Sequence, residues 1–236
     1  MDGPELLLLA LFVGLLVSGM WIPFAVGIAA VAWLLVANGT ASLRSIGLVS
    51  WGSMNSFTLT AIPLFILMAE ILLESGLSQR VFRGLSVMVR RLPGGLMQTS
   101  IAGCALFSAV SGSSVACAAA IGTVSLPQLR ARGYDLPLAT GALAAGGTLG
   151  ILIPPSIAMI VYGTFAQASV LKLFMAGVIP GLMLTALFMI YVAARAWLNP
   201  ALAPLEAKPA PGAWRAALQD VLPFVVLVTL LMASLY

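Results

Sequence analysis

Long stretches without a charged side chain set the pattern of this sequence. Residues 6–43, 92–129, 136–171 and 173–194 contain no Asp, Glu, Lys or Arg. Uncharged apolar runs of about 18 residues or more are typical of membrane spans, since a helix needs about 20 residues to cross the hydrocarbon core. The pattern predicts an all-α polytopic membrane protein.

The N-terminal part of the chain contains four predicted elements. Residues 5–18 and 22–37 would each form a helix about 21–24 Å long, so they are interpreted as two short, broken or tilted spans. Residues 41–56 carry Arg44 and suit an interfacial turn or a short amphipathic helix. Residues 57–75 form a span.

A basic amphipathic segment follows at residues 78–93. Arg83 and Arg90 are seven residues apart and share a helical face, which is typical of a helix lying along a membrane surface. Further arginines flank the uncharged run 92–129 at both ends, so the positive-inside rule places both ends in the cytoplasm. The run therefore predicts a helical hairpin. The flanking arginines are Arg80, Arg83, Arg90, Arg91, Arg130 and Arg132.

Three more apolar segments are predicted. Residues 136–166 form a span with a proline pair inside it, residues 173–198 form another, and residues 218–235 form the last. The last two are separated by a proline-rich polar linker at 199–217, which its basic residues place on the cytoplasmic side.

Composition narrows the class of protein. The chain of 236 residues is 61% hydrophobic and 8% charged, which a soluble domain of this size does not match. Its net charge of +4 comes without a basic run interleaved with aromatics, so nucleic-acid binding is not predicted. Histidine is absent, which removes Ser-His catalysis and His-based metal sites, and two cysteines define no disulfide framework.

The midpoint of the run 92–129 is polar and contains a glycine. Ser111, Gly112, Ser113 and Ser114 form this apex, which predicts a helix–turn–helix. In a re-entrant hairpin the apex would lie at membrane depth, and Ser113 or Ser114 would N-cap the second arm and offer its free N–H groups to an anion. In a full two-span hairpin the apex is an ordinary loop outside the membrane. The sequence is compatible with both arrangements.

The second candidate is the sequence from Thr148 to Ser156, which contains Pro154 and Pro155. Neither proline has an N–H, so in a continuous helix the carbonyls of Gly150 and Ile151 would be released. Freed carbonyls in a discontinuous transmembrane helix can coordinate Na⁺, whereas the alternative is a simple proline kink. A break that directly follows a polar hairpin favours a transport site.

Glu70 has two possible roles. It is an intramembrane carboxylate near the end of its span, and we weigh an ion pair or packing role against ion coupling. A serine protease at the apex is not favoured, because histidine is absent and the two lysines lie in predicted loops.

Taken together, six motifs resemble the large membrane subunit of tripartite ATP-independent periplasmic (TRAP) transporters, of the dicarboxylate and sialic-acid uptake type. The likeness covers nearly all of residues 15–200. The motifs are Ala61-Ile-Pro-Leu-Phe-Ile-Leu-Met-Ala-Glu70, Arg91-Leu-Pro-Gly-Gly95, Ser111-Gly-Ser-Ser-Val-Ala116 running into Ala118-Ala-Ala-Ile-Gly122, Arg132-Gly-Tyr-Asp135, Thr148-Leu-Gly-Ile-Leu-Ile-Pro-Pro-Ser156 and Ala176-Gly-Val-Ile-Pro-Gly181.

The resemblance implies an elevator-type transporter of the ion-transporter superfamily, in the bacterial inner membrane. Two inverted repeats would each supply a re-entrant hairpin and a broken helix, and Na⁺ and substrate would sit at the hairpin tips. The implied parts are scaffold spans at 1–77, an arm helix at 78–93, half of a transport domain at 94–172 (hairpin 94–131, broken helix 136–166), a span at 173–198, a cytoplasmic linker at 199–217 and the start of a second half at 218–236.

By the same resemblance the site residues divide into two groups. The hairpin tip is Ser111, Gly112, Ser113 and Ser114, and the helix break is Thr148, Gly150, Ile151, Pro154, Pro155 and Ser156. The chain departs from the family at Cys117, where relatives often have a carboxylate, and in its length, which is about half of that implied by two repeats.

The expected function is therefore sodium-coupled import of a small organic anion, without enzymatic activity or a cofactor. The expected partners are a periplasmic binding protein, a small membrane subunit and the missing second repeat. The alternatives are another symporter or antiporter of the superfamily that uses no binding protein, and a non-transporting membrane scaffold fragment.

Overall fold

The computed structural model describes residues 3–89, 91–204 and 212–235, and within them every regular element is a helix. This confirms the predicted all-α fold. The chain divides into two compact units, residues 1–56 and residues 57–236. The predicted boundaries between scaffold, arm and transport parts remain predictions.

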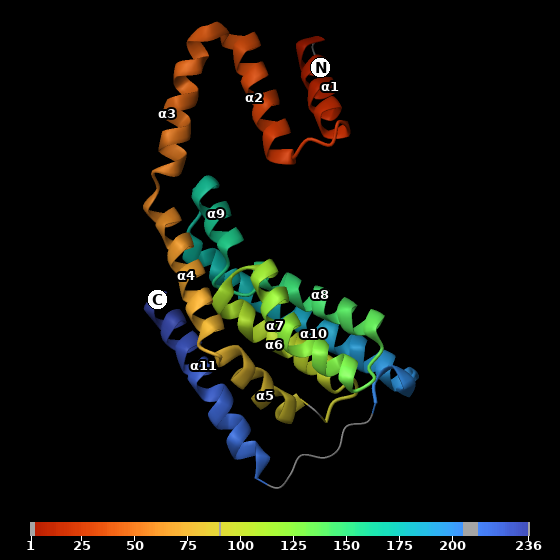
Figure 1. Cartoon of the computed structure of the whole chain (residues 1–236). Helices are drawn as coiled ribbons and strands as arrows, with labels where there is room; N and C mark the ends of the chain where they lie inside the picture. The colour runs from red at the N-terminus through yellow and green to blue at the C-terminus, as the bar shows by residue number, and fades with distance from the viewer. Residues whose placement is uncertain (1–2, 90, 205–211, 236) are drawn as a thin grey trace. The chain divides into compact units, whose positions relative to one another are not determined.

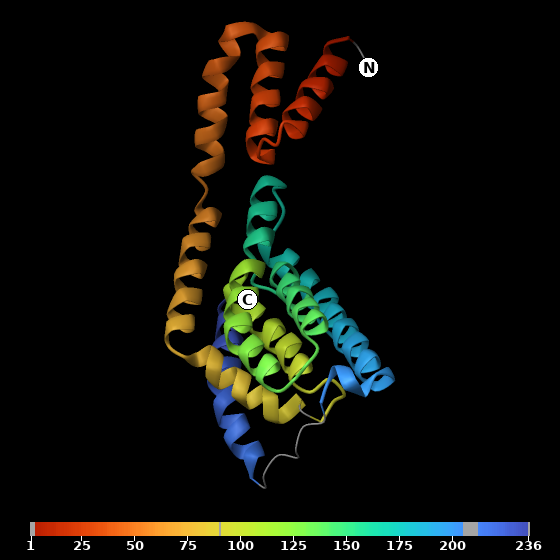
Figure 2. The same cartoon turned by 45° about the vertical axis from the view of Figure 1, so that its right-hand side comes forward.

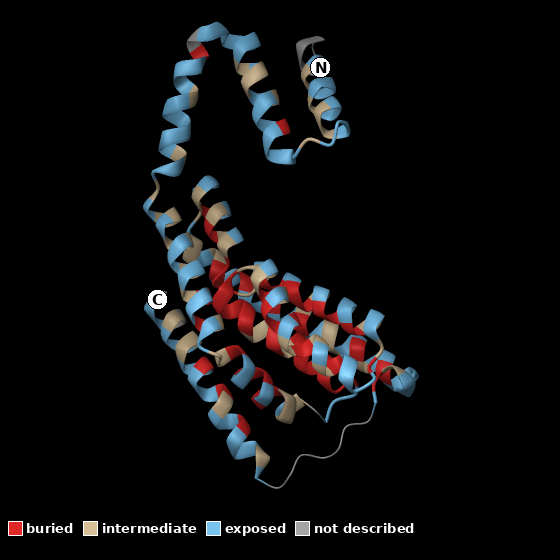
Figure 3. Ribbon diagram, in the orientation of Figure 1, coloured by how far each residue is buried: buried red, intermediate tan, exposed pale blue. Residues whose placement is uncertain are grey.

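The first unit consists of three helices with little buried surface. α1 (Gly3–Val17) and α2 (Ile22–Asn38) are connected through a turn at Gly19, whose φ is 80°. α3 (Ser42–Met54) shows that residues 41–56 form a short helix rather than a turn. Most described side chains of this unit are exposed, as the predominantly pale blue colour of its three helices in Figure 3 shows.

The second unit begins with a short 3₁₀ turn, η2 (Phe57–Thr60), followed by α4 (Ala61–Glu74) and α5 (Leu77–Val89). α5 has the predicted amphipathic character: Val81, Phe82 and Leu85 are buried, while Arg80 and Arg83 are exposed. Arg90, which was predicted to share the face of Arg83, lies outside the described residues.

The core of the second unit is a hairpin packed against a broken helix (Figure 1). α6 (Leu96–Ser111) and α7 (Ser114–Ala131) form the hairpin, and α8 (Leu136–Leu152) and α9 (Ile157–Phe165) form the broken helix. Glycines permit the close approach of α8: a Cβ on Gly146 would lie 3.0 Å from the Cys104 side chain, and one on Gly147 would lie 2.9 Å from the Ala118 Cβ. Most of the buried residues gather here, as the red helices of Figure 3 show.

Two long helices complete the unit. α10 (Val170–Leu198) runs beside α6 and α8, and α11 (Ala213–Leu235) runs along α5 (Figures 1 and 2). α11 begins at Ala213, inside the segment predicted to be a linker, because Ala217 and Val221 pack against Gly84 of α5. A Cβ on Gly84 would lie 2.6 Å from Val221 and 2.7 Å from the Ala217 carbonyl. The linker residues 205–211 lie outside the described part of the chain.

Four segments of the described chain are long and apolar enough to cross a membrane. They are residues 57–74, 136–165, 170–198 and 213–231, while α1, α2 and α6 are shorter apolar helices. The second of these segments includes the interruption between α8 and α9. The prediction of a polytopic membrane protein is confirmed.

Candidate functional site

The hairpin tip is a two-residue turn between α6 and α7. Gly112 adopts the left-handed conformation (φ 58°), and its N–H donates to the Ser108 carbonyl at 3.1 Å, which closes the C-terminus of α6. Ser113 is the N-cap of α7, with its Oγ accepting a hydrogen bond from the Ala116 N–H at 3.4 Å. Glycine in the left-handed region and serine at an N-cap are the residue types that such a turn favours.

The helix break lies at the predicted proline pair. α8 ends at Leu152, and the Ile153 N–H donates to the Leu149 carbonyl at 2.8 Å. Pro154 and Pro155 are buried and joined by a cis peptide bond, and α9 starts at Ile157. Since neither proline carries an N–H, the carbonyls of Gly150 and Ile151 have no helical donor.

The tip and the break contact each other through their backbones. The Ile157 N–H at the start of α9 donates to the Gly112 carbonyl at 3.1 Å. A Cβ on Gly112 would lie 2.7 Å from the Pro155 carbonyl oxygen, and a Cβ on Gly150 would lie 2.8 Å from the Ser114 backbone nitrogen. Both glycines are therefore needed for this approach. Figure 2 shows the turn of the hairpin beside the junction of α8 and α9.

Two helix N-termini meet at this contact, those of α7 and α9. Each carries backbone N–H groups that have no partner within the helix and a partial positive charge from the helix dipole. The electrostatic character of the junction is therefore suited to an anionic group, while the carbonyls of the break add oxygen ligands of the kind that Na⁺ prefers.

Two hydroxyl groups at the junction are buried without a hydrogen-bond partner among the described residues. They are Ser114 Oγ in the first turn of α7 and Ser156 Oγ at the N-cap of α9. An unsatisfied buried hydroxyl costs about 1–3 kcal/mol, so a polar ligand at the junction would offset a cost that these two hydroxyls impose on the fold. The described residues hold no cluster of three or more Asp, Glu, Cys or His side chains, so a cation here would bind hydroxyl and carbonyl oxygens.

The structure separates the predicted break residues into two sets. Gly150, Pro154, Pro155 and Ser156 are buried beside the tip. The Thr148 side chain is exposed, and its hydroxyl donates to the Ala145 carbonyl at 2.6 Å. Ile151 is 50% exposed, so only its backbone carbonyl belongs to the break.

Of the predicted tip residues, Ser111 serves the turn itself. It is buried, and its Oγ donates to the Ser113 carbonyl at 3.4 Å. Ser111, Gly112, Ser113 and Ser114 thus lie together as predicted, but the structure gives them different partners.

The side chains of Glu70 and Cys117 take no part in the contact between tip and break, although the Cys117 N–H donates to the Ser113 carbonyl at 3.0 Å. Glu70 is exposed on α4. Cys117 is fully buried inside the hairpin, where its thiol donates to the Cys104 carbonyl at 3.3 Å and accepts from the Ser108 hydroxyl at 3.4 Å. The structure therefore places Cys117 in the packing between α6 and α7.

One functional residue was not identified from the sequence. Ile157 supplies the N–H that binds the tip, but an apolar side chain at the start of a helix gives no sign of such a role. Three glycines bring α8 close to the hairpin, namely Gly146, Gly147 and Gly150. Gly146 and Gly150 are four residues apart, a spacing that permits close helix packing in membranes.

Comparisons with known proteins identify the family of this chain. Residues 9–236 match the family model described as the tripartite ATP-independent periplasmic transporter, DctM component. The chain is 38% identical over 192 residues to the C4-dicarboxylate TRAP transporter large permease protein of Vibrio cholerae, which covers 80% of this chain and 42% of that protein.

Two further relatives carry other names. The isethionate TRAP transporter permease protein of Oleidesulfovibrio alaskensis is 38% identical over 188 residues, covering 80% of this chain and 29% of that protein. The sialic acid TRAP transporter large permease protein of Vibrio cholerae is 33% identical over 172 residues, covering 73% and 40%. The chain thus spans less than half the length of these relatives.

The family is one of membrane permeases rather than enzymes, and its members are integral proteins of the bacterial inner membrane. The match of the family model to nearly the whole chain, together with the apolar helices of the structure, places this protein there as a multi-pass protein. The chain belongs to the large permease component family of the tripartite ATP-independent periplasmic transporters.

Proposed function

We propose that this chain is part of a permease that imports a small organic anion together with Na⁺. The observation that supports the proposal is the backbone contact between Gly112 and Ile157, flanked by the unsatisfied hydroxyls of Ser114 and Ser156. A buried junction with oxygen ligands and two helix N-termini suits a cation and an anion bound next to each other.

Different parts of the junction would take the two charges. The carbonyls of Gly150 and Ile151 and the free hydroxyls would bind Na⁺ through their oxygen atoms. These groups bind Na⁺ as neutral ligands, so none of them has to lose a proton. The N-termini of α7 and α9 would face the carboxylate of the substrate. The three relatives are named for C4-dicarboxylate, sialic acid and isethionate, which are all small organic anions, and this is the substrate class that we propose here.

The proposal extends to the working assembly. A periplasmic binding protein would deliver the anion, a small membrane subunit would stand beside the scaffold, and a second repeat would complete the site with another hairpin and break. The unit of hairpin and broken helix would move as one body in an elevator motion, with α5 as the arm that joins it to the scaffold. The tight packing of α8 on the hairpin supports motion as one body.

Uptake into proteoliposomes tests this function. The complete permease is reconstituted with its small subunit and binding protein, and uptake of radiolabelled succinate, sialic acid and isethionate is measured with an inward gradient of Na⁺ or of K⁺. We expect uptake of at least one anion with Na⁺ only. Uptake at the same rate in K⁺ would contradict sodium coupling, and uptake without the binding protein would favour a symporter that works alone.

A further inference from the structure

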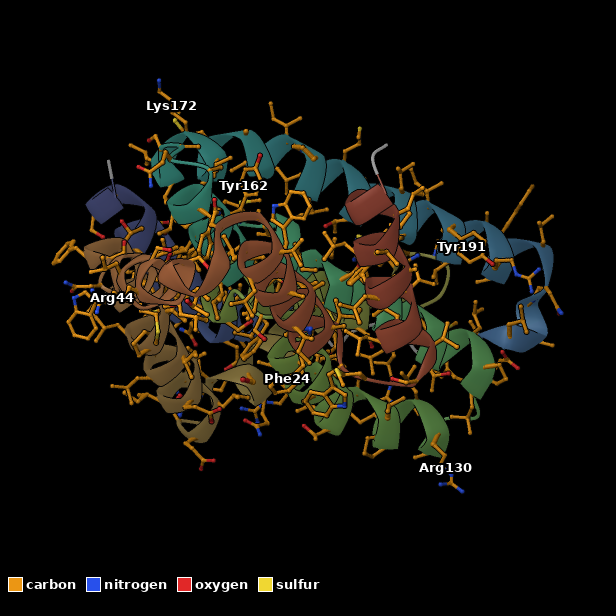
Figure 4. The ribbon with its side chains drawn as sticks, turned by 90° about the horizontal axis from the view of Figure 1, so that it is seen from above. Phe24, Arg44, Arg130, Tyr162, Lys172 and Tyr191 are labelled. Carbon is orange, nitrogen blue, oxygen red and sulfur yellow. The ribbon has the colours of Figure 1, made fainter. Side chains whose placement is uncertain are left out.

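An apolar groove lies on the outer side of the second unit, between α8 and α10. Its volume is about 300 Å³. Pro137, Gly141 and Ala145 line it from α8, and Phe188, Tyr191 and Val192 line it from α10. Tyr191, labelled on α10 in Figure 4, is 59% exposed, so the groove is open to its surroundings. It is separate from the junction of tip and break, to which none of its lining residues belongs.

Gly141 leaves open space in the groove that the described chain does not fill. A Cβ added there would meet no atom within 4 Å, whereas each of the other helical glycines in the described part of residues 57–236 would meet one. Glycine in a helix costs about 1 kcal/mol relative to alanine. The packing of this chain accounts for the other helical glycines of this unit, but not for Gly141.

The length of the groove is close to the thickness of one leaflet of the membrane. From Pro137 to Ala145 a helix rises by about 12 Å, at about 1.5 Å per residue. The hydrocarbon core is about 30 Å thick, so one leaflet contributes about 15 Å. The groove therefore has the depth of a single leaflet, which suits an acyl chain better than a helix that crosses the whole bilayer.

A positively charged side chain, that of Arg195, lies at one end of the groove. Phe188, Tyr191, Val192 and Arg195 follow the spacing i, i+3, i+4, i+7, so they share one face of α10. Arg195 is exposed, and no ion pair of its guanidinium is found among the described residues.

One carboxylate, Asp135, also belongs to this end. The Asp135 N–H donates to the Leu202 carbonyl just beyond α10, and its carboxylate accepts from the Leu138 N–H at 2.9 Å. The start of α8 thus compensates the charge of Asp135, which leaves the guanidinium of Arg195 to attract an anion.

We propose that the groove binds one phospholipid with an anionic headgroup. One acyl chain lies along Gly141 between α8 and α10, and the phosphate lies at Arg195. An apolar groove of one-leaflet depth with a cation at its end complements this ligand in both shape and charge. The phospholipid would be retained on purification, unlike the lipids that exchange freely around the protein.

Native mass spectrometry of the complete permease tests the proposal. Gly141→Phe fills the groove, and Gly141→Leu is a smaller variant for the case in which the first does not fold. Ala186→Phe, at an exposed position on the face of α10 opposite to the groove, is the matched control. We expect the wild type and the control to retain one more phospholipid per chain than the groove variants. Equal retention in all of them would overturn the proposal.

Arg195→Gln tests the charge. Phosphatidylglycerol and phosphatidylcholine are supplied in equal amounts, and the ratio of the two lipids retained is measured. We expect this ratio to fall about fivefold in Arg195→Gln, while the total amount of phospholipid retained stays the same. An unchanged preference would contradict the placement of the headgroup.

A photoreactive benzophenone amino acid at position 141 tests the identity of the occupant. In the membrane we expect a crosslink to phospholipid. A crosslink to a protein segment instead would show that the groove is a helix-docking site and would overturn the lipid proposal.

Discussion

The N-termini of α7 and α9 are both capped by serine, yet the two caps differ. Ser113 and Ser156 have nearly the same backbone conformation, with φ and ψ of −130° and 124° in one and −124° and 128° in the other. Ser113 Oγ accepts from the Ala116 N–H, whereas Ser156 Oγ is buried and makes no side-chain cap. The Ser113 hydroxyl thus stabilises its helix, and the Ser156 hydroxyl remains available to a ligand.

The difference also shows which helix depends on the other. α7 is closed by its own N-cap, so the tip is a self-sufficient turn. α9 is only nine residues long, and its first N–H is paired with Gly112 of the tip. Isolated helices this short are marginal, so the start of α9 depends on the hairpin. A change in the tip is therefore expected to disturb both helices, and a change at Ser156 only the ligand.

Gly112→Ala is expected to have the largest effect, because it affects both N-termini. A residue with a Cβ in the left-handed conformation costs about 1–2 kcal/mol, and the contact at 2.7 Å with the Pro155 carbonyl adds a packing cost of about 1–3 kcal/mol. We expect at least a tenfold loss of uptake together with a lower thermal unfolding temperature in detergent. Gly133→Ala, at another left-handed glycine with open space around it, separates the backbone cost from the contact.

Gly150→Ala is expected to come second, because it affects the contact but leaves the turn intact. Its Cβ would lie 2.8 Å from the Ser114 nitrogen and 2.9 Å from the Ser113 carbonyl oxygen, and backbone atoms cannot move aside as side chains do. An overpacking cost of about 1–3 kcal/mol follows, measured as a shift of thermal unfolding, with uptake reduced. The matched control is Gly47→Ala, at a helical glycine of α3 that also has open space around it, and it should stabilise α3 by up to about 1 kcal/mol. Equal effects of the two substitutions would show that the tip and break do not touch.

The features that the sequence predicted well depend on local backbone chemistry. Gly112 and Ser113 are typical of a helix end followed by a helix start, and Pro154 and Pro155 remove N–H donors wherever they stand. The turn and the break were therefore found at the predicted residues. The early start of α11 was not predicted, because Ala217 and Val221 are ordered by packing on Gly84 rather than by their own sequence.

The contact between the hairpin tip and the helix break could not be predicted from the sequence either. Gly112 and Ile157 are distant along the chain, and their hydrogen bond joins two backbone groups that any residue pair could supply. The different roles of the serines depend on the same tertiary packing. The Ser111 hydroxyl donates to a backbone carbonyl, the Ser113 hydroxyl accepts from a backbone N–H, and the Ser156 hydroxyl has no partner among the described residues. No pattern of residue types distinguishes them.

Ser156→Ala and Ser113→Ala test the comparison of the two caps directly. Loss of the Ser113 cap should lower the free energy of unfolding by about 1 kcal/mol, whereas Ser156→Ala removes a hydroxyl without a partner and should leave unfolding unchanged or slightly improved. Uptake measured against Na⁺ concentration should show the opposite order. The half-saturating Na⁺ concentration should rise about fivefold or more in Ser156→Ala, because one lost hydrogen bond to the ion weakens binding by about 1 kcal/mol. If Ser113→Ala weakens Na⁺ dependence and Ser156→Ala destabilises the fold, the roles assigned to the two caps are reversed.

Thr148→Val is expected to have the smallest effect, although Thr148 belongs to the predicted break. Its side chain is exposed, and its hydroxyl donates to the Ala145 carbonyl within the same helix, a bond that contributes little beyond the helical hydrogen bonds already present. Valine keeps the shape of threonine, so we expect uptake and Na⁺ dependence within about twofold of the wild type, since exposed substitutions change stability by about 0.5 kcal/mol or less. A shift in Na⁺ dependence as large as that of Ser156→Ala would show that the site extends around α8 to the Thr148 face. The ligand would then bind between this helix and a part of the permease outside residues 57–236, rather than at the hairpin tip alone.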